Sequence, residues 1–497
     1  MGRVIRAPEP RWRAFAVCLV AAFMTLLDVS IVNVALPSIR SGLSASQTQL
    51  QWIVSGYALA FGLVLVPAGR LGDVRGRRTM FIVSLALFTA ASAGCGLAPT
   101  ATWLIVGRLV QGVAGGMLNP QVSGLVQELF RGPERGRAFG LQGAVIGIST
   151  AIGPLAGGVL ISAFGTEHGW RSVFFVNVPI GLVAVVLAWR LLPRPRAALH
   201  RESLDPVGVA LLGAGVLLVL LPIVEQGSGG PGPAGGSGES AGSGGGAPWY
   251  LALLAVPVLA GFVAWERRHA RHGTPMIDPA LFRRVSYVFG VAVGLVYFAG
   301  FTAIFFVFAL YLQSGLGYDA LQSGLAITPF AAGSAVASLL AGRVVSRIGR
   351  PLVAGGLATV AVGLAATAVV VRVADGHSVG LATALPLLVA GLGSGAVISP
   401  NVTLTLSEVP VEQGGTAGGV LQTFQRIGSA VGIAGVGTVF FGGLAGPTPP
   451  DWTSALVTAL VVCVVAVAVA LAVALADVVQ SRRRDRRTPR DPAVPHA

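Results

Sequence analysis

The stretch GRLGDVRGRRTM, Gly69 to Met80, places one aspartate and four arginines in twelve residues between two long apolar runs. The chain around it has 497 residues, of which 54% are hydrophobic and only 11% charged, whereas soluble proteins average about 25% charged residues. This composition indicates an integral membrane protein. The charged stretch is then expected to be a short connection between two membrane-spanning helices.

Fourteen apolar runs are long enough, at roughly 20 residues each, to cross the hydrocarbon core as helices. Their approximate limits are 14–36, 52–71, 79–97, 101–124, 138–161, 172–192, 206–224, 248–265, 286–312, 322–342, 351–371, 379–402, 414–440 and 453–476. The sequence therefore predicts an all-α integral membrane protein with fourteen transmembrane helices.

The basic residues fix the expected orientation. They number 34 against 20 acidic residues, and all are arginine because the chain contains no lysine. Placing the N-terminus in the cytoplasm puts most of them on that side, in the loops that carry Arg75, Arg131, Arg194, Arg267 and Arg347 and in the tail SRRRDRRTPR. This is the positive-inside pattern. It predicts a multi-pass protein of the cell inner membrane with both termini cytoplasmic, and it explains the net charge of +14 without nucleic acid.

The charged stretch has a second, looser copy. AGRLGDVRGRR at 68–78 and AGRVVSRIGR at 341–350 align Gly69 with Gly342 and Arg77 with Arg350. Both copies join the second and third helices of a six-helix set, which predicts two parallel six-helix bundles. The expected domains are 1–200 for the first bundle, 201–275 for two additional helices with a glycine-rich external loop, 276–480 for the second bundle, and 481–497 for a basic cytoplasmic tail.

The residue types argue against an ATP-driven pump and against an enzyme. A phosphate-binding loop of the GxxxxGK[ST] type needs a lysine, which this chain lacks. The six histidines lie in loops or tails without a metal-binding or nucleophilic arrangement, and the three cysteines lie inside apolar runs. We therefore expect no catalytic residue, no metal and no cofactor, and an ion gradient as the energy source.

Asp28 lies within the first predicted helix, in LLDVSIVNVALP. An ionised carboxylate in this position costs at least about 2.5 kcal/mol, so it is expected to face a polar cavity or to bind a proton. Asn33 lies one to two turns further along the helix and is expected to share that lining. A structural pairing of Asp28 with a neighbouring helix is the alternative.

Arg108 and Gln111 lie three residues apart on the fourth predicted helix, in IVGRLVQGVAGGMLNP. A guanidinium remains charged when buried, so Arg108 requires a partner or a wet cavity. Its expected role is proton coupling, with a static tie between helices as the alternative. Arg426, in LQTFQRIGSAVG, either faces the cavity and favours anionic or zwitterionic ligands, or lies near a helix end with its head group at the membrane surface.

The fifth predicted helix contains STAIGPLAGGVL. Pro154 removes a backbone hydrogen bond, while Gly153, Gly157 and Gly158 lack side chains. This helix is expected to kink and to allow close approach of a neighbour.

Together these stretches resemble the fourteen-helix drug:proton antiporters of the major facilitator superfamily. GRLGDVRGRRTM is similar to the signature of the loop between helices 2 and 3, LLDVSIVNVALP to the first-helix motif, and RLVQGVAGGMLNP to the fourth-helix motif. STAIGPLAGGVL is similar to the antiporter motif of helix 5, with Ser149 where glycine is usual. The resemblance covers about residues 14–476.

The resemblance implies a conformational latch at the charged stretch. In this family the aspartate, here Asp73, contacts arginines and a helix N-terminus of the opposite half in the outward-open state and releases them in the inward-open state. The other residues of this motif here are Gly69, Arg70, Gly72, Gly76, Arg77 and Arg78. The second copy has Ser346 where Asp73 stands, so the latch is expected on one side only. The alternative is that these arginines only set the topology.

The expected function is a monomeric, proton-coupled multidrug exporter that moves hydrophobic, cationic drugs, dyes or antibiotics by alternating access. Its partners would be a small-molecule drug or metabolite, protons and the lipid bilayer. Three alternatives remain: export of an endogenous anionic metabolite or lipid, a self-resistance exporter for one antibiotic, and a membrane sensor that does not transport.

Overall fold

A computed structural model of the chain describes residues 9–165, 168–194, 205–226, 250–271, 275–374, 376–444 and 451–487. Every regular element in these residues is a helix. The glycine-rich loop predicted between the two additional helices, and the last part of the tail predicted at 481–497, lie outside the described residues.

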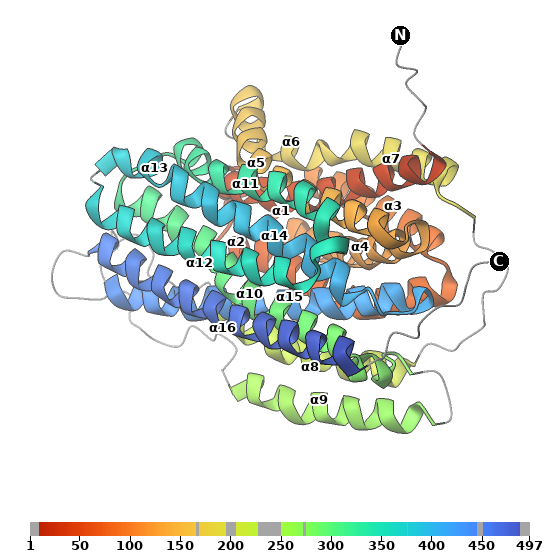
Figure 1. The fold of residues 1–497 in the computed structure, drawn as a ribbon. Coiled ribbons are helices and arrows are strands. Elements are labelled where there is room, and N and C mark those ends of the chain that lie inside the picture. Colours follow the sequence, from red (N-terminus) through yellow and green to blue (C-terminus); the bar gives the residue numbers. More distant parts are fainter. Residues whose placement is uncertain are drawn as a thin grey trace, which may run out of the picture.

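The helices form two groups and one peripheral pair (Figure 1). The N-terminal helix group contains α1 (Pro10–Leu43), α2 (Gln47–Arg75), α3 (Arg77–Gly96), α4 (Ala101–Leu129), α5 (Gly132–Phe164), α6 (Trp170–Phe175) and α7 (Asn177–Leu191). The peripheral pair is α8 (Pro206–Gln226) and α9 (Tyr250–His269). The C-terminal helix group contains η1 (Pro279–Arg283), α10 (Val285–Leu310), η2 (Tyr311–Gly315), α11 (Ala320–Ile348), α12 (Arg350–Val373), η3 (Gly376–Ser378), α13 (Val379–Ala382), α14 (Ala384–Thr405), η4 (Val411–Gln413), α15 (Gly414–Leu444) and α16 (Trp452–Arg487).

Twelve helical segments within the described residues are long and apolar enough to cross a membrane. They include α6 and α7 as one broken span, Trp170–Leu191, whereas α8 and α9 are not among the twelve. The described apolar part of α8 is the shorter segment Pro206–Pro222. The all-helical fold agrees with the prediction, and the count of fourteen spans stays a prediction.

The sequence repeat extends over the whole of α2 and α11. Each helix starts with a capping box, in which the Ser46 or Asp319 side chain accepts a hydrogen bond from the backbone of the glutamine three residues later. Each ends at a glycine with positive φ, 98° at Gly76 and 67° at Gly349. A residue with a side chain adopts that backbone rarely, which explains a glycine at both helix ends.

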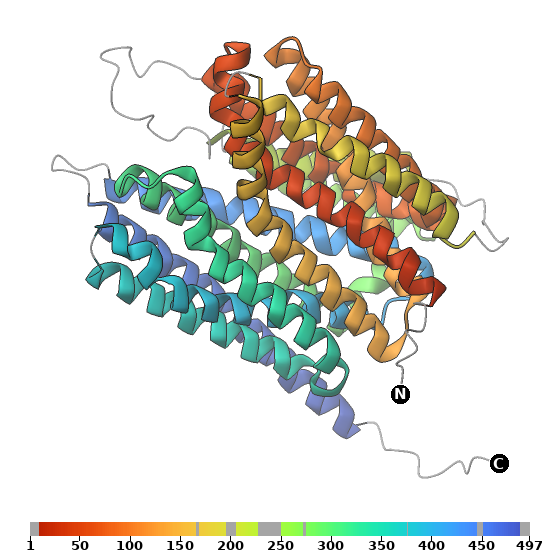
Figure 2. The ribbon, with the colours of Figure 1, turned by 90° about the horizontal axis from the view of Figure 1, so that it is seen from above.

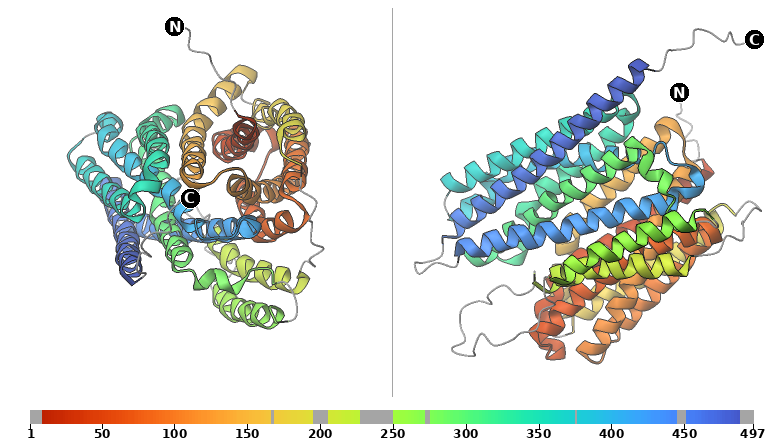
Figure 3. Two further views of the ribbon diagram at one scale, coloured as in Figure 1. Left: turned by 45° about the vertical axis from the view of Figure 1, so that its right-hand side comes forward. Right: turned by 90° about the horizontal axis from the view of Figure 1, so that it is seen from below.

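The two helix groups meet mainly where α2 crosses α15 and where α5 crosses α11 (Figures 2 and 3). The peripheral helix α8 packs against α2 and α15, and α9 packs on the outside of α8 (Figure 1). Figure 2 shows that α1 begins and α16 ends at the same end of the bundle. We call this the terminal end. The charged stretch lies there; it forms the last turns of α2 and the start of α3, with Gly76 between the two helices.

Candidate functional site: a buried charge network, a central cavity and a closed end

Asp28 lies midway along α1, is fully buried, and accepts hydrogen bonds from three side chains. Arg108 Nη1 lies 2.6 Å from its Oδ2, while Gln111 Nε2 and Asn177 Nδ2 each lie 2.8 Å from its Oδ1. All three groups are donors, so their arrangement suits an ionised carboxylate. A proton on Asp28 would have to displace at least one donor. The Asp28 carboxylate therefore joins α1 to α4 and α7.

Arg108 is also buried and makes several hydrogen bonds. It is 2% exposed, its Nε donates to the carbonyl of Ile53 at 3.1 Å, and its Nη1 also donates to Gln111 Oε1 at 2.8 Å. Gln111 Nε2 extends the network to Ser92 Oγ at 2.8 Å. The structure thus joins Asp28, Arg108 and Gln111 in one network. Asp28 is paired with a neighbouring helix, the arrangement given as the alternative for this residue, and Arg108 has the partner that its burial requires.

A cavity lies beside this network, next to Arg108 and Tyr57. About 70 Å³ of it is open to the centres of water molecules, which is room for several waters. Its lining is mostly apolar and consists of Val29, Val32, Asn33, Val54, Tyr57, Ala58, Phe61, Arg108 and Arg426. Asn33 is exposed on the wall, as predicted, but Asp28 lies behind Arg108 and is not part of the lining.

Arg426 of α15 faces this cavity across the boundary between the helix groups. Its Cζ lies 4.6 Å from the centroid of the Phe61 ring. On the same wall, Cζ of Arg108 lies 4.1 Å from the centroid of the Tyr57 ring, and the two aromatic rings are 6.0 Å apart. Two arginines therefore flank one aromatic pair, each over a ring face. Of the two positions predicted for Arg426, the structure has the one on the cavity wall.

At the terminal end, the Asp73 carboxylate bridges the two helix groups. Its side chain is 1% exposed and accepts hydrogen bonds from the first backbone N–H groups of α15, Gly415 N at 3.0 Å and Thr416 N at 2.7 Å. Thr416 Oγ1 donates at 2.8 Å and Arg77 Nη2 at 2.7 Å. We call Asp73, Arg77, Gly415 and Thr416 the Asp73 cluster. A carboxylate is favourable there because helix N-terminal amides carry partial positive charge.

Arg77 spans the same boundary. It donates to the carbonyl oxygen of Gly124 at 2.8 Å within its own group and to that of Val411 in the C-terminal group. The neighbouring arginines have other contacts: Arg78 donates to the Trp189 carbonyl, and the charge of Arg70 acts on Glu266 of α9. Asp73 and Arg77 therefore both bond across the boundary.

Glycines allow this close approach. A Cβ at Gly69 would lie 2.4 Å from the carbonyl oxygen of Gly415, and one at Gly72 would lie 1.9 Å from Oε1 of Gln121. On the fifth helix, a Cβ at Gly153 would lie 2.4 Å from Ser30 Cβ of α1, and one at Gly157 would lie 3.0 Å from an Ile31 carbon. A Cβ at Gly158 would meet nothing within 4 Å.

Two of the predicted antiporter-motif glycines therefore pack against α1, and Gly158 does not. The side chain of Pro154 lies outside the described residues.

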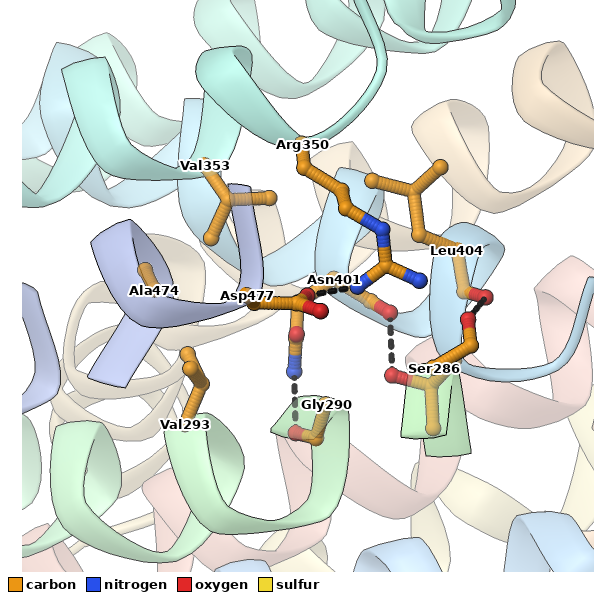
Figure 4. A pocket seen from close by; sticks show the side chains of 10 residues that line it. Ser286, Gly290, Val293, Arg350, Val353, Asn401, Leu404, Ala474 and Asp477 are labelled. Atoms are coloured by element: carbon orange, nitrogen blue, oxygen red, sulfur yellow. Dashed lines mark hydrogen bonds and ion pairs between the residues drawn. The ribbon is translucent and has the colours of Figure 1, made fainter. Parts of the chain in front are cut away.

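The second copy of the repeat makes contacts of a different kind. Arg350, the counterpart of Arg77, forms an ion pair with Asp477 of α16, in its own helix group (Figure 4). Nearby, Asn401 Nδ2 donates to the Gly290 carbonyl at 2.9 Å. Only about 10 Å³ of this pocket is open to water centres, so it holds about one water molecule and no substrate.

Sequence reasoning missed four residues of the site. Asn177 reaches Asp28 because the helix breaks between α6 and α7, directly before it. The signal was an Asn close to a proline in the apolar span GWRSVFFVNVPIG. Tyr57 and Phe61 have the spacing of one helix face, but any apolar helix offers such pairs. Thr416 became relevant only through its contact with Asp73.

Among the residues that the structure describes, no group of three or more His, Cys, Asp or Glu is placed to hold a metal. A buried charge network, a cavity between two helix groups and a closed end define a membrane transporter of small molecules.

The chain belongs to the major facilitator superfamily, whose family model matches residues 18–433 and 292–495. It is therefore a multi-pass membrane transporter and not an enzyme.

Similar proteins include antibiotic exporters and resistance proteins. The chain is 39% identical over 440 residues to a probable actinorhodin transporter of Streptomyces coelicolor, an alignment that covers 87% of this chain and 73% of that protein. It is 35% identical over 461 residues to a puromycin resistance protein of Streptomyces alboniger, covering 91% of this chain and 86% of that protein.

Among solved structures, the human organic anion transporter MFSD10 matches with a TM-score of 0.64 and 13% identity, over 94% of this chain and 100% of that chain. This match concerns the fold alone. Together, the family match and the similar antibiotic exporters and resistance proteins place the chain among drug and antibiotic efflux transporters.

Proposed function

We propose that this protein is a proton-coupled exporter of hydrophobic drugs or antibiotics that works by alternating access. It would lie in the cell inner membrane as a monomer with both termini cytoplasmic, with α8 and α9 as two further spans beyond the twelve. The proposed units are the bundles 1–200 and 276–480, joined by 201–275 and followed by the tail 481–497. Export as the direction of transport is supported by the relatives named for antibiotic transport and resistance.

The observation that carries proton coupling is the Asp28 network. A carboxylate held only by donors changes its contacts when a proton binds, since a protonated oxygen must face an acceptor or open space. Loss of the Asp28 contact to Arg108 would leave a buried guanidinium without its counterion, which is strongly unfavourable. The helices α1 and α4 would then repack, and this repacking links the proton to the shape of the cavity.

The Asp73 cluster supports alternating access. It closes the terminal end, since the carboxylate of one helix group caps the first turn of α15 in the other. The cavity lies further along the same helices: Arg426 is eleven residues beyond Gly415, or about 16 Å at 1.5 Å per residue. Release of Asp73 would open the cavity toward the terminal end, which is the cytoplasmic side in the proposed orientation.

The contacts of Asp28 bear on the expected preference for cationic substrates. A cation that binds Asp28 has to displace Arg108, because the carboxylate already accepts three hydrogen bonds and does not line the cavity. The cavity instead carries Arg426. This observation favours the second candidate of the sequence analysis, an exporter of anionic compounds.

The test is substrate-driven proton movement in proteoliposomes that contain the purified full-length protein. Ethidium, puromycin and anthracene-2-carboxylate serve as a cationic, a neutral-to-basic and an acidic probe. We expect at least one probe to move protons with the wild type, none to do so with Asp28→Asn, and Asp28→Glu to retain part of the activity. Asp451→Asn is the matched control, because Asp451 is an exposed N-cap residue of α16 far from the cavity. Proton movement by Asp28→Asn at the wild-type rate contradicts the proposal.

A further inference from the structure

One charged side chain of the cavity lining, that of Arg426, has no ion-pair or hydrogen-bond partner among the described residues. Arg426 is exposed, and its guanidinium lies over the ring of Phe61. By contrast, the neighbouring Arg108 has Asp28, Gln111 and the Ile53 carbonyl.

An arginine in this position keeps its charge, since the guanidinium does not deprotonate in proteins. Stacking on Phe61 satisfies only the face of the planar group. The N–H donors around its edge remain free, and they match the oxygen pair of a carboxylate in a bidentate arrangement. The lining of the cavity contains no Asp or Glu that would compete for these donors.

A second unpartnered polar group lies on the same wall. Tyr57 is 3% exposed, and its hydroxyl has no hydrogen-bond partner among the described residues. Buried tyrosine hydroxyls usually have a partner, so a ligand oxygen that reaches this hydroxyl would satisfy it. The rings of Tyr57 and Phe61, 6.0 Å apart and tilted by 30°, form an apolar surface between the two arginines. Asn33 adds an exposed amide across the cavity.

We propose that Arg426 binds the anionic group of a planar aromatic substrate, a carboxylate or phenolate, while the aromatic body of the substrate packs against Phe61 and Tyr57. This inference rests on the proposed export function and assigns a substrate class to it. Arg426 is the residue that selects for negative charge, and Tyr57 donates a hydrogen bond to an oxygen of the same ligand. Asp28 and Arg108 remain paired and serve the proton.

The experiment compares probes that differ in charge and not in shape. Anthracene-2-carboxylate and anthracene-2-carboxamide are titrated into the purified full-length protein at pH 7.5, with ethidium as the cationic probe, and binding is followed by probe fluorescence. We expect the carboxylate to bind about tenfold to a hundredfold more tightly than the amide, the range of a hydrogen bond to a charged group. Arg426→Gln removes this difference, and Arg426→Lys retains part of it.

Arg372→Gln is the matched control, an exposed arginine near the end of α12 that is not part of the cavity lining. Thermal unfolding in detergent verifies that each variant is folded. If Arg426→Gln does not fold, the comparison of the three probes on the wild type and Arg426→Lys still decides. Equal affinity of the wild type for carboxylate and amide, tighter binding of ethidium, absence of binding, or a preserved preference in folded Arg426→Gln each overturns the inference.

The outcome is separate from that of the proposed function. Preference for the carboxylate without substrate-driven proton movement would leave the subsite intact and refute proton-coupled export. Proton movement driven by ethidium alone would support proton-coupled export and refute the anion subsite.

Discussion

Asp73→Asn should open the terminal end of the protein. The substitution keeps the shape of the side chain but removes the charge that three donors of α15 share, Gly415 N, Thr416 N and Thr416 Oγ1. It also removes the closer ion-pair partner of Arg77, whose second partner, Glu128, lies 3.7 Å away. These three bonds exist only while the helix groups are in contact, so their loss destabilises the closed conformation and not the open one.

The size of the effect follows from the bonds. Hydrogen bonds to charged groups contribute about 1.5–3 kcal/mol each, and they are not additive within one cluster. A loss of about 3 kcal/mol in total changes the ratio of closed to open molecules about 150-fold. An open conformation that is populated at about 1% in the wild type would thereby become the major one.

The assay is double electron–electron resonance between spin labels at Thr79 of α3 and Ser346 of α11, which are exposed and belong to different helix groups. The cysteines of the chain, Cys18, Cys95 and Cys463, are all buried, so labelling is directed to the introduced sites. We expect one short distance in the wild type and a longer distance as the main component in Asp73→Asn. Asp319→Asn, an exposed cap within one helix group, should retain the short distance. An unchanged distance distribution in folded Asp73→Asn would refute the proposed role of the cluster.

Two further predictions use the same protein. Gly415→Ala places a Cβ 2.7 Å from Asp73 Oδ1 and 2.8 Å from the Gly69 carbonyl oxygen. This overpacking costs about 1–3 kcal/mol and should also lengthen the distance between the two spin labels. Gly435→Ala on the same helix is the control, because its Cβ meets nothing within 4 Å and the distance between the labels should stay unchanged. Burial raises the pKa of Glu266, near the end of α9, from 4.5 to about 7, so the stability that its neutral form contributes is present below about pH 4.5 and is lost as pH rises through 7. The melting temperature in detergent should therefore fall between pH 5 and pH 8 in the wild type and fall less in Glu266→Gln, and parallel curves for the two proteins would contradict this assignment.

The sequence predicted the parts of the site that the hydrophobic pattern isolates. Asp28 and Arg108 stand out because each is a charge inside an apolar run, and such residues require partners. The register of the repeat predicted that the charged stretch joins two helices of a bundle. These signals are local to one helix, so they appear in the order of residues alone.

Contacts between distant helices could not be predicted in this way. Asn177 becomes a partner of Asp28 only because α7 begins beside α1, and Thr416 becomes a partner of Asp73 only because α2 crosses α15. The prediction for Arg426 remained open for the same reason: its surroundings consist of Phe61 and Tyr57, which belong to α2. The predicted count of fourteen spans stays a prediction, because α8 and α9 are not among the twelve described segments that are long and apolar enough to cross a membrane.

The repeat gives the protein two similar crossings that differ in chemistry. Gly342, the counterpart of Gly69, approaches α5 so closely that a Cβ there would lie 2.5 Å from the Gly136 carbonyl oxygen, just as Gly69 approaches α15. The second crossing, however, has Ser346 in place of Asp73, and Arg350 is paired with Asp477 inside its own helix group. Small residues at both crossings let the backbones touch, but only the α2–α15 crossing has a carboxylate that holds the other group by charge. We therefore infer that the α5–α11 crossing remains packed while the α2–α15 crossing opens, and that rotation of the helix groups takes place about the former.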